Sequence, residues 1–258
     1  MGKALVVSVS GKGGVGKTTL VALLLKAILE RDNRKDILVV DADPAANLPD
    51  VLGVRVEKTV GMVANELKRK IEKGQLPIGV SKSDLLEAWV YSTLLELEDF
   101  DMLVMGRTEG EGCYCYVNSI LTRILDTLLS NYDLVLMDME AGLEHLSRRT
   151  DKDVDVMVIV TDPSLMGFKT ALRIKELAKE VHIEVKRIYI VGNRFPASME
   201  KRLKEWASKK GVEAAGIIPD DPLIAEYNLT GKSLLDLPNN SPAFTSAKEI
   251  AKKIGIID

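Results

Sequence analysis

The chain has few cysteines, few aromatic residues and no long apolar run, and these absences exclude whole classes of protein. It has two cysteines among 258 residues, too few for a secreted scaffold held together by disulfides. No apolar stretch approaches the roughly 20 residues that a membrane-spanning helix needs. The first residues also lack the pattern of a cleavable signal peptide. We therefore expect a cytoplasmic protein with no membrane partner.

An excess of positive charge is also missing. The chain has 35 Lys and Arg residues against 38 Asp and Glu, which gives a net charge of −3 at pH 7. Domains that bind nucleic acid usually carry a basic footprint, so we expect no nucleic-acid partner. The length and the apolar fraction of 46% suit a single α/β domain that spans residues 1–258.

One glycine-rich loop organises the chain. It follows an apolar, β-type run at 5–9 and leads into a helical pattern that starts at Leu20. The loop consists of Gly11, Lys12, Gly13, Gly14, Val15, Gly16, Lys17, Thr18 and Thr19. Glycines let a backbone wrap around a polyphosphate, and the N-terminus of the following helix attracts the same anion. This context predicts a phosphate-binding loop.

Two side chains of the loop have defined roles in such a site. We expect Lys17 to contact the β- and γ-phosphates and the Thr18 hydroxyl to hold Mg²⁺. The alternative is an ordinary glycine-rich turn, which does not require a lysine and a hydroxyl at these offsets. The sequence therefore predicts a nucleoside triphosphate site.

Lys12 is a second lysine in the loop, and a nucleotide bound within one subunit does not require it. The arrangement resembles the deviant Walker A motif of dimeric ATPases that include MinD, ParA and the nitrogenase iron protein. The resemblance implies that Lys12 reaches across a face-to-face homodimer to the partner's phosphates, where it acts as an arginine finger does. A solvated loop lysine is the alternative.

Continuous apolar runs alternate with helical patterns along the chain. Such runs are typical of parallel strands that are buried on both faces; they lie at 5–9, 37–41, 102–105, 134–137, 154–160, 187–191 and 212–218. Helical patterns occupy 20–30, 117–129, 165–179 and 199–210. We therefore predict an α/β fold, a doubly wound P-loop NTPase with a mainly parallel sheet of about seven strands. We expect residues 54–100 to form a variable helical insertion that is interrupted at 76–79.

Two further aspartates follow predicted strands. Asp43 lies just after the run at 37–41, where a carboxylate orients the attacking water or binds Mg²⁺ through water. A turn or capping aspartate is the alternative. Asp138 ends the apolar run at 132–137, as a Walker B aspartate does, and we expect it to contact Mg²⁺, through water. We thus predict that Lys12, Lys17 and Asp43 are catalytic.

The nucleotide base is expected near Asn193, Arg194 and Pro219. Asn193 and Arg194 follow the predicted strand at 187–191, where related nucleotide-binding proteins contact the base. A GTPase would have an aspartate two residues after Arg194, and this chain has Pro196 there. We therefore predict ATP as the substrate and ADP as the product. A helix cap or turn is the alternative for Asn193.

Cys113 and Cys115 are separated by one residue and follow the predicted strand at 102–105. In an extended backbone, residues two apart project to the same face, so the two thiols converge. A tetrahedral Zn²⁺ or a square-planar Ni²⁺ requires four ligands, and a two-fold homodimer supplies two from each subunit. Buried structural cysteines and a redox pair are the alternatives.

Several motifs occur together in one order: the glycine-rich loop, Asp41-Ala42-Asp43-Pro44, Cys113-Tyr114-Cys115, and a segment at 138–146 that contains Ala-Gly-Leu-Glu-His-Leu. This combination closely resembles the CooC family, the accessory ATPases for nickel insertion into carbon monoxide dehydrogenase. The resemblance implies ATP hydrolysis coupled to the delivery of Ni²⁺ to that enzyme. It also implies a metal site on Cys113 and Cys115 between two subunits, which Zn²⁺ can occupy as well.

The resemblance is incomplete in two places, and two other functions stay open. Arg194 stands where lysine is common in the family, and residues 54–100 match only loosely. A MinD/ParA-type positioning ATPase would use ATP to switch its binding to a membrane or DNA. An iron–sulfur carrier of the same fold would hold a cluster on the four thiolates of a dimer.

Overall fold

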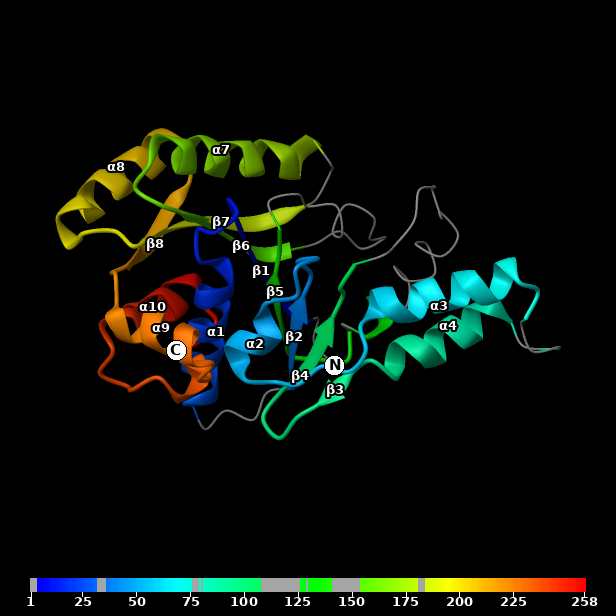
Figure 1. The fold of residues 1–258 in the computed structure, drawn as a ribbon. Helices are drawn as coiled ribbons and strands as arrows, with labels where there is room; N and C mark the ends of the chain where they lie inside the picture. The colour runs from blue at the N-terminus through cyan, green and yellow to red at the C-terminus, as the bar shows by residue number, and fades with distance from the viewer. Residues whose placement is uncertain are drawn as a thin grey trace.

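A mainly parallel β-sheet forms the centre of the molecule (Figure 1). The computed structural model describes residues 4–31, 36–75, 79, 81–107, 126–128, 130–140, 154–180 and 184–258. Its strands are β1 (Leu5–Gly11), β2 (Ile37–Asp41), β3 (Leu95–Glu96), β4 (Asp101–Val104), β5 (Leu134–Asp138), β6 (Val154–Thr161), β7 (Val185–Asn193) and β8 (Glu213–Ile218). They form one 8-stranded sheet in the order β3-β4-β2-β5-β1-β6-β7-β8.

The predicted sheet is confirmed, with one strand more than expected. Each of the seven predicted apolar runs is a strand, and these strands pair in parallel. The additional strand is β3, which pairs antiparallel with β4 at the edge of the sheet. It was missed because a strand of two residues leaves no periodic pattern in a sequence.

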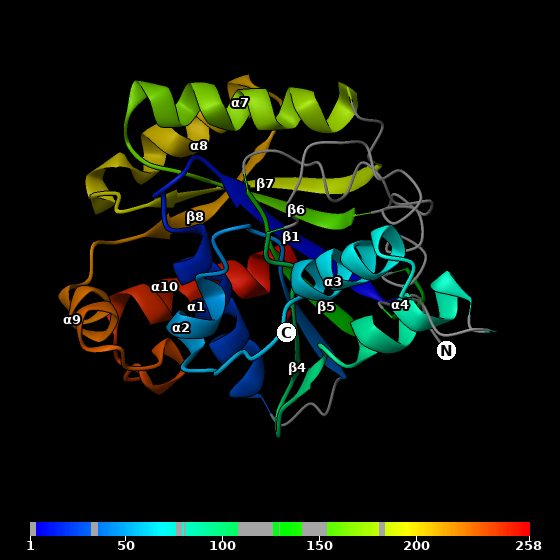
Figure 2. The ribbon, with the colours of Figure 1, turned by 45° about the vertical axis from the view of Figure 1, so that its right-hand side comes forward.

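Helices cover both faces of the sheet (Figures 1 and 2). They are α1 (Lys17–Leu29), α2 (Leu48–Leu52), α3 (Val60–Glu72), α4 (Lys82–Tyr91), α7 (Leu165–Glu180), α8 (Glu200–Lys209), α9 (Pro222–Thr230) and α10 (Pro242–Ile254), with 3-10 turns at Ala197–Met199 and Leu234–Asp236. Buried side chains of α3, α4, α7 and α8 share one hydrophobic cluster. Those of α1, α2 and α10 form the other. The fold is therefore doubly wound, as predicted.

Residues 54–100 contain the helices α3 and α4 and the strand β3. Thr59 caps α3 by accepting a hydrogen bond from the Met62 N–H, and Ser81 caps α4 in the same way. The two helices pack against each other and bury Leu67 and Leu86. Most of the predicted interruption, residues 76–78, lies outside the described residues. The predicted helix at 117–129 also lies largely outside them.

The apolar face of α10 is part of the core. Phe244, Ile250 and Ile254 are at most 1% exposed, and the helix packs against α1 and β8. Ser241 caps its start, and the Ser241 hydroxyl donates to the buried Asp221 carboxylate at 2.6 Å. This helix therefore offers no exposed apolar face to a membrane. Among the described helices, none is long and apolar enough to cross a bilayer.

Candidate nucleotide-binding site

The functional residues meet because parallel strands end at one edge of the sheet. Strand β5 lies between β1 and β2, so Asp138 at its end is level with Val9 on one side and Asp41 on the other. The glycine-rich loop leaves β1 at Gly11 and leads into α1 at Lys17. The edge thus brings the loop and two carboxylates together.

The loop has the backbone shape of a phosphate cradle. Gly14 and Gly16 have φ angles of 73° and 94°, in the left-handed region that favours glycine. A Cβ added at Gly13 or Gly14 would meet no atom of the described residues within 4 Å. No side chain caps the first turn of α1, which leaves its N–H groups to bind an anion. Lys17 starts the helix and is only 6% exposed.

The Thr18 and Asp138 side chains meet at the base of the loop. The Thr18 hydroxyl donates to Asp138 Oδ2 at 2.6 Å. Asp138 Oδ1 is buried and has no hydrogen-bond partner among the described residues. Hard oxygen ligands of this kind suit Mg²⁺, so these residues fit the predicted ion. Burial raises the pKa of Asp138 to about 7, and the nearby Asp41 and Asp43 charges act in the same direction.

Asp41 shapes the loop that carries Asp43. Its carboxylate is fully buried and accepts the N–H groups of Asp43 at 3.1 Å and Leu48 at 3.0 Å. Burial raises the pKa of Asp41 to about 6. Asp43 is partly exposed, and its carboxylate accepts the Ala45 N–H at 2.9 Å. The catalytic role of Asp43 stays a prediction, and Asp41 is the residue that holds its backbone in place.

Asn193 braces the phosphate loop. Its side-chain Nδ2 donates to the Val15 carbonyl oxygen at 2.8 Å and occupies the position that a Cβ on Gly16 would need. The neighbouring Arg194 is exposed, with a φ of 56°, and Pro219 is partly buried. The sequence alone placed Asn193 at the base, whereas the described contact is with the loop backbone. The base contacts of these three residues stay predictions.

We expect Asn193→Ala to weaken both the fold and nucleotide binding. The Val15 carbonyl oxygen would lose its buried donor, which costs about 1 to 3 kcal/mol. Urea unfolding measures the stability, and fluorescence titration with a labelled ATP measures the affinity. Asn47→Ala is the matched control, because Asn47 is exposed and its side chain makes no capping bond to α2. Equal losses in the two variants would contradict the bracing role.

Asp162 is a charged residue of the site that sequence reasoning missed. It follows β6, and the Ser164 hydroxyl donates to its carboxylate. The Ser164 hydrogen bond lowers the pKa of Asp162, and the positive charges of Lys12 and Arg194 add to this effect. Asp162-Pro163-Ser164 has the composition of an ordinary turn, so no signal in the sequence pointed to a role. Lys12 itself is exposed on the loop.

The end of β4 connects the nucleotide edge to the segment with the cysteines. The Met105 N–H donates to the Asp41 carbonyl oxygen at 2.8 Å, and Arg107 is the last described residue before that segment. Cys113 and Cys115 lie outside the described residues. Within the described ranges, no group of three or more His, Cys, Asp or Glu residues is arranged to hold a metal ion.

The fold and the site define a class, the P-loop nucleotide-binding proteins with a doubly wound sheet. Within this class, the chain belongs to the CobQ/CobB/MinD/ParA nucleotide-binding domain family, whose model matches residues 6–234.

Two relatives align over most of their length. An uncharacterized ATP-binding protein of Methanocaldococcus jannaschii is 48% identical, over 97% of this chain and 98% of the relative. The carbon monoxide dehydrogenase accessory protein CooC of Rhodospirillum rubrum is 29% identical, over 92% of this chain and 90% of the relative.

Solved structures agree on the fold. The MinD cell division protein of Aquifex aeolicus has a TM-score of 0.68 and 21% identity, and the alignment covers 99% of this chain and 98% of that protein. A ParA family ATPase from Chlorobium tepidum TLS has a TM-score of 0.70 and 22% identity, over 96% of this chain and 99% of that protein. At this level of sequence identity, the similarity supports a shared fold and no shared function.

Proposed function

We propose that the protein is an ATP-hydrolysing metallochaperone. It binds Ni²⁺ on Cys113 and Cys115 at the interface of a homodimer and couples ATP hydrolysis to nickel insertion into carbon monoxide dehydrogenase. The observation that carries the coupling is the hydrogen bond from the Met105 N–H to the Asp41 carbonyl oxygen. This bond connects the end of β4, which leads to the cysteines, with the edge of the sheet that holds the nucleotide site. The 29% identity to a carbon monoxide dehydrogenase accessory protein supports the choice of client.

The described residues divide the hydrolysis step among them. Lys17 and the N–H groups of the loop bind the phosphates, while Thr18 and Asp138 hold Mg²⁺, which supplies positive charge against the developing negative charge. Asp43 orients the attacking water. Lys12 of one subunit stabilises the phosphates bound to the other, as an arginine finger does.

A short chain of backbone contacts links hydrolysis to the cargo. The Asp41 carboxylate fixes the loop that carries Asp43, and the Asp41 carbonyl oxygen accepts the Met105 N–H. The Met105 carbonyl oxygen in turn accepts the Gly61 N–H at 2.8 Å, which ties the start of α3 to the same point. A change in the Asp43 loop on hydrolysis therefore displaces the strand end before the cysteines. Such coupling is reciprocal, so nickel must change ATP affinity by the factor by which ATP changes nickel affinity.

Metal content and mass, measured on the same sample, test the proposal. Apo-protein is loaded with Ni²⁺, with and without ADP or ATP, and separated by size exclusion with light scattering. We expect about one Ni²⁺ per dimer in the wild type. The double variant Cys113→Ser/Cys115→Ser is expected to lose the nickel and keep its ATP affinity, because the glycine-rich loop is unchanged. A wild type that binds no nickel, or a variant that binds it equally well, would leave a nucleotide-switched ATPase of unknown client.

A MinD/ParA-type positioning ATPase is the second candidate, and the family match favours it. The buried apolar face of α10 argues against a membrane-binding role for that helix. Pelleting with vesicles and with DNA, in the presence of ATP, distinguishes this function from the first. Visible absorbance after anaerobic purification tests the iron–sulfur carrier.

A further inference from the structure

Three neighbouring strands end in charged residues of alternating sign at the carboxyl edge of the sheet. Lys12 follows β1, Asp162 follows β6 and Arg194 follows β7, and these strands lie side by side in the sheet. The register is continuous across them, because Gly11 pairs with Val160 and the next residue of β6 pairs with β7. The strand order therefore places Asp162 between the two basic residues, beside the glycine-rich loop.

The Asp162 carboxylate is anchored through one of its two oxygens. Oδ1 accepts the Ser164 N–H at 3.0 Å and also the Ser164 hydroxyl. The Ser164 hydroxyl oxygen accepts the Gly167 N–H at 3.0 Å, in the first turn of α7. A Cβ on Gly167 would collide with Asp162 Oδ1, so the helix packs closely against the carboxylate. Oδ2 accepts no hydrogen bond from the described residues, which leaves this oxygen open to a cation.

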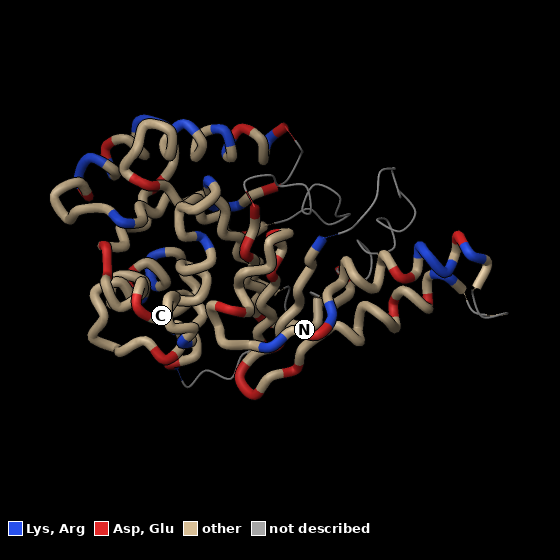
Figure 3. The backbone as a smooth tube through the Cα atoms, in the orientation of Figure 1, with Lys and Arg blue, Asp and Glu red and all other residues tan. Residues whose placement is uncertain are grey.

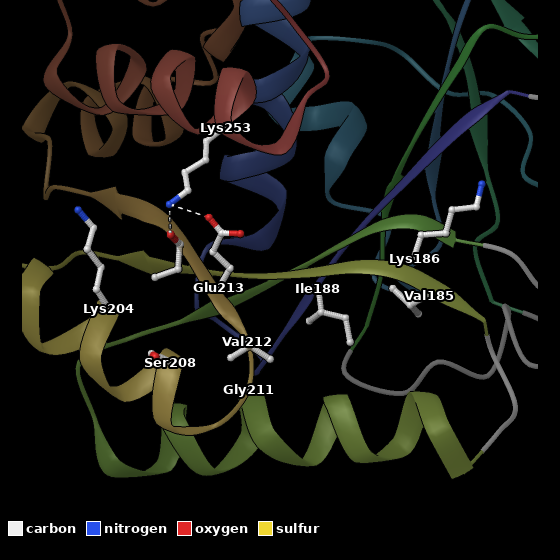
Figure 4. Close-up of a pocket in the computed structure, with 10 residues that line it drawn as sticks. Val185, Lys186, Ile188, Lys204, Ser208, Gly211, Val212, Glu213 and Lys253 are labelled. Atoms are coloured by element: carbon white, nitrogen blue, oxygen red, sulfur yellow. Dashed lines mark hydrogen bonds and ion pairs between the residues drawn. The ribbon is translucent and has the colours of Figure 1, made fainter.

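Lys12 has no carboxylate bound to it within the described part of the chain. Basic and acidic residues are interspersed over that part (Figure 3), and a lysine near the opposite edge of the sheet shows the contrast. Lys253 lies 3.1 Å from Glu213 (Figure 4), whereas Lys12 is exposed and forms no ion pair with the described residues. The charge of Lys12 still acts on Asp162. The Ser164 hydrogen bond lowers the pKa of Asp162, and the Lys12 charge lowers it further.

A fixed carboxylate beside a flexible lysine limits the positions of the ammonium group. The lysine side chain has a flexible four-carbon stem, so an exposed Lys12 samples many orientations. Asp162 cannot follow these changes, because Ser164 holds its Oδ1. The carboxylate therefore sets the preferred position, and the lysine adapts to it. A group that is oriented before the reaction contributes more to the rate than one that must first be ordered.

We propose that Asp162 is a positioning residue for Lys12. It attracts the ammonium group of Lys12 in its own subunit and holds this group at the carboxyl edge of the sheet, where it meets the phosphates of a partner subunit. The inference rests on the proposed action of Lys12 across the dimer and adds the residue that orients it. It requires neither the cysteines nor nickel.

The first test is the rate of hydrolysis of the full-length protein at saturating ATP. Asp162→Asn should lower this rate about twofold to fivefold, the range that an exposed ion pair contributes. Asparagine keeps an oxygen for both Ser164 bonds, so the turn is retained. ATP affinity should stay unchanged, and Asp162→Glu should recover part of the rate because it keeps the charge. Asp99→Asn, at an exposed position before β4, is the matched control and should hydrolyse ATP at the wild-type rate.

Mixed dimers show on which subunit Asp162 acts. A subunit with Lys17→Ala supplies Lys12, and a subunit with Lys12→Ala holds the ATP. Asp162→Asn on the supplying subunit should lower the rate of the mixture by the same factor, about twofold to fivefold. The same substitution on the ATP-holding subunit should leave the rate unchanged. When both subunits carry Lys12→Ala, Asp162→Asn should have no further effect, because two residues that act through one group are not additive.

Equal losses from the two placements would overturn the proposal, and so would a loss that occurs only on the ATP-holding subunit. An Asp162→Asn protein with the wild-type rate would also overturn it, as would a loss of ATP affinity as large as the loss of rate. A Lys12→Ala protein with full activity is a distinguishable result, because it would overturn the action of Lys12 across the dimer itself.

Discussion

Replacing Lys12 with alanine is expected to lower ATP hydrolysis about 10³-fold, the lower end of what an arginine finger contributes. Nucleotide binding to the single subunit should change little. Lys12 is exposed on the loop, whereas Lys17 is buried at the start of α1. We therefore expect the two lysines to have different tasks, with Lys17 holding the phosphates of its own subunit. Phosphate release measures hydrolysis, and titration with a labelled ATP measures binding.

Two further variants make the Lys12 result specific. Lys17→Ala should abolish nucleotide binding as well as hydrolysis. Lys209→Ala, an exposed lysine on α8, should leave both unchanged. Mixing the Lys12 variant with the Lys17 variant is the sharper experiment. An intact Lys12 on a subunit that binds no ATP can then act on ATP held by the other subunit, so the mixture should regain activity. A Lys12 variant that hydrolyses ATP at the wild-type rate would contradict the proposed mechanism.

Asp138→Asn is expected to stabilise the nucleotide-free protein at pH 8 and to leave its stability at pH 4 nearly unchanged. The pKa of Asp138 is raised by burial from 3.8 to about 7. Between these values the folded protein keeps a proton that the unfolded chain releases. The free energy of unfolding therefore falls as pH rises from about 4 to about 7. The loss is on the order of 4 kcal/mol, at 1.36 kcal/mol for each pKa unit.

Urea unfolding at the two pH values, without Mg²⁺ and nucleotide, measures this effect. Asparagine carries no charge at pH 8 and keeps an oxygen for the Thr18 hydroxyl. Asp41 has its pKa raised to about 6. In the Asp138 variant, the free energy of unfolding should therefore still fall between pH 4 and 6, by a smaller amount. Asp99→Asn, an exposed loop aspartate, should behave as the wild type does. Mg²⁺ and ATP should stabilise the Asp138 variant less than they stabilise the wild type. An equal increase in the free energy of unfolding of the two proteins would argue against magnesium ligation by Asp138.

The sheet and the loop could be predicted because their signals are local. Buried parallel strands are continuous apolar runs, and a phosphate loop needs glycines and a lysine at fixed offsets. Strand β3 could not be predicted, since its two residues take their structure from pairing with β4. Local patterns carry no information on such pairing.

The contacts inside the site were harder to predict for the same reason. Asn193 was recognised as a residue at a strand end, but its bond to Val15 joins residues 178 positions apart. Asp162 follows a different strand from the loop and comes near Lys12 only because β1 and β6 are neighbours. Both contacts depend on the order of the strands in the sheet, and the sequence of a single segment does not determine that order.

The exposed position of Lys12 has a consequence for the rate law. If this lysine acts only on a neighbour's phosphates, an isolated subunit lacks part of its own catalytic machinery. At protein concentrations below the dissociation constant of the dimer, the rate of hydrolysis then rises with the square of the protein concentration. Above that constant, the rate rises in proportion to the concentration. A cell would thus set the onset of ATP consumption through the abundance of the protein itself.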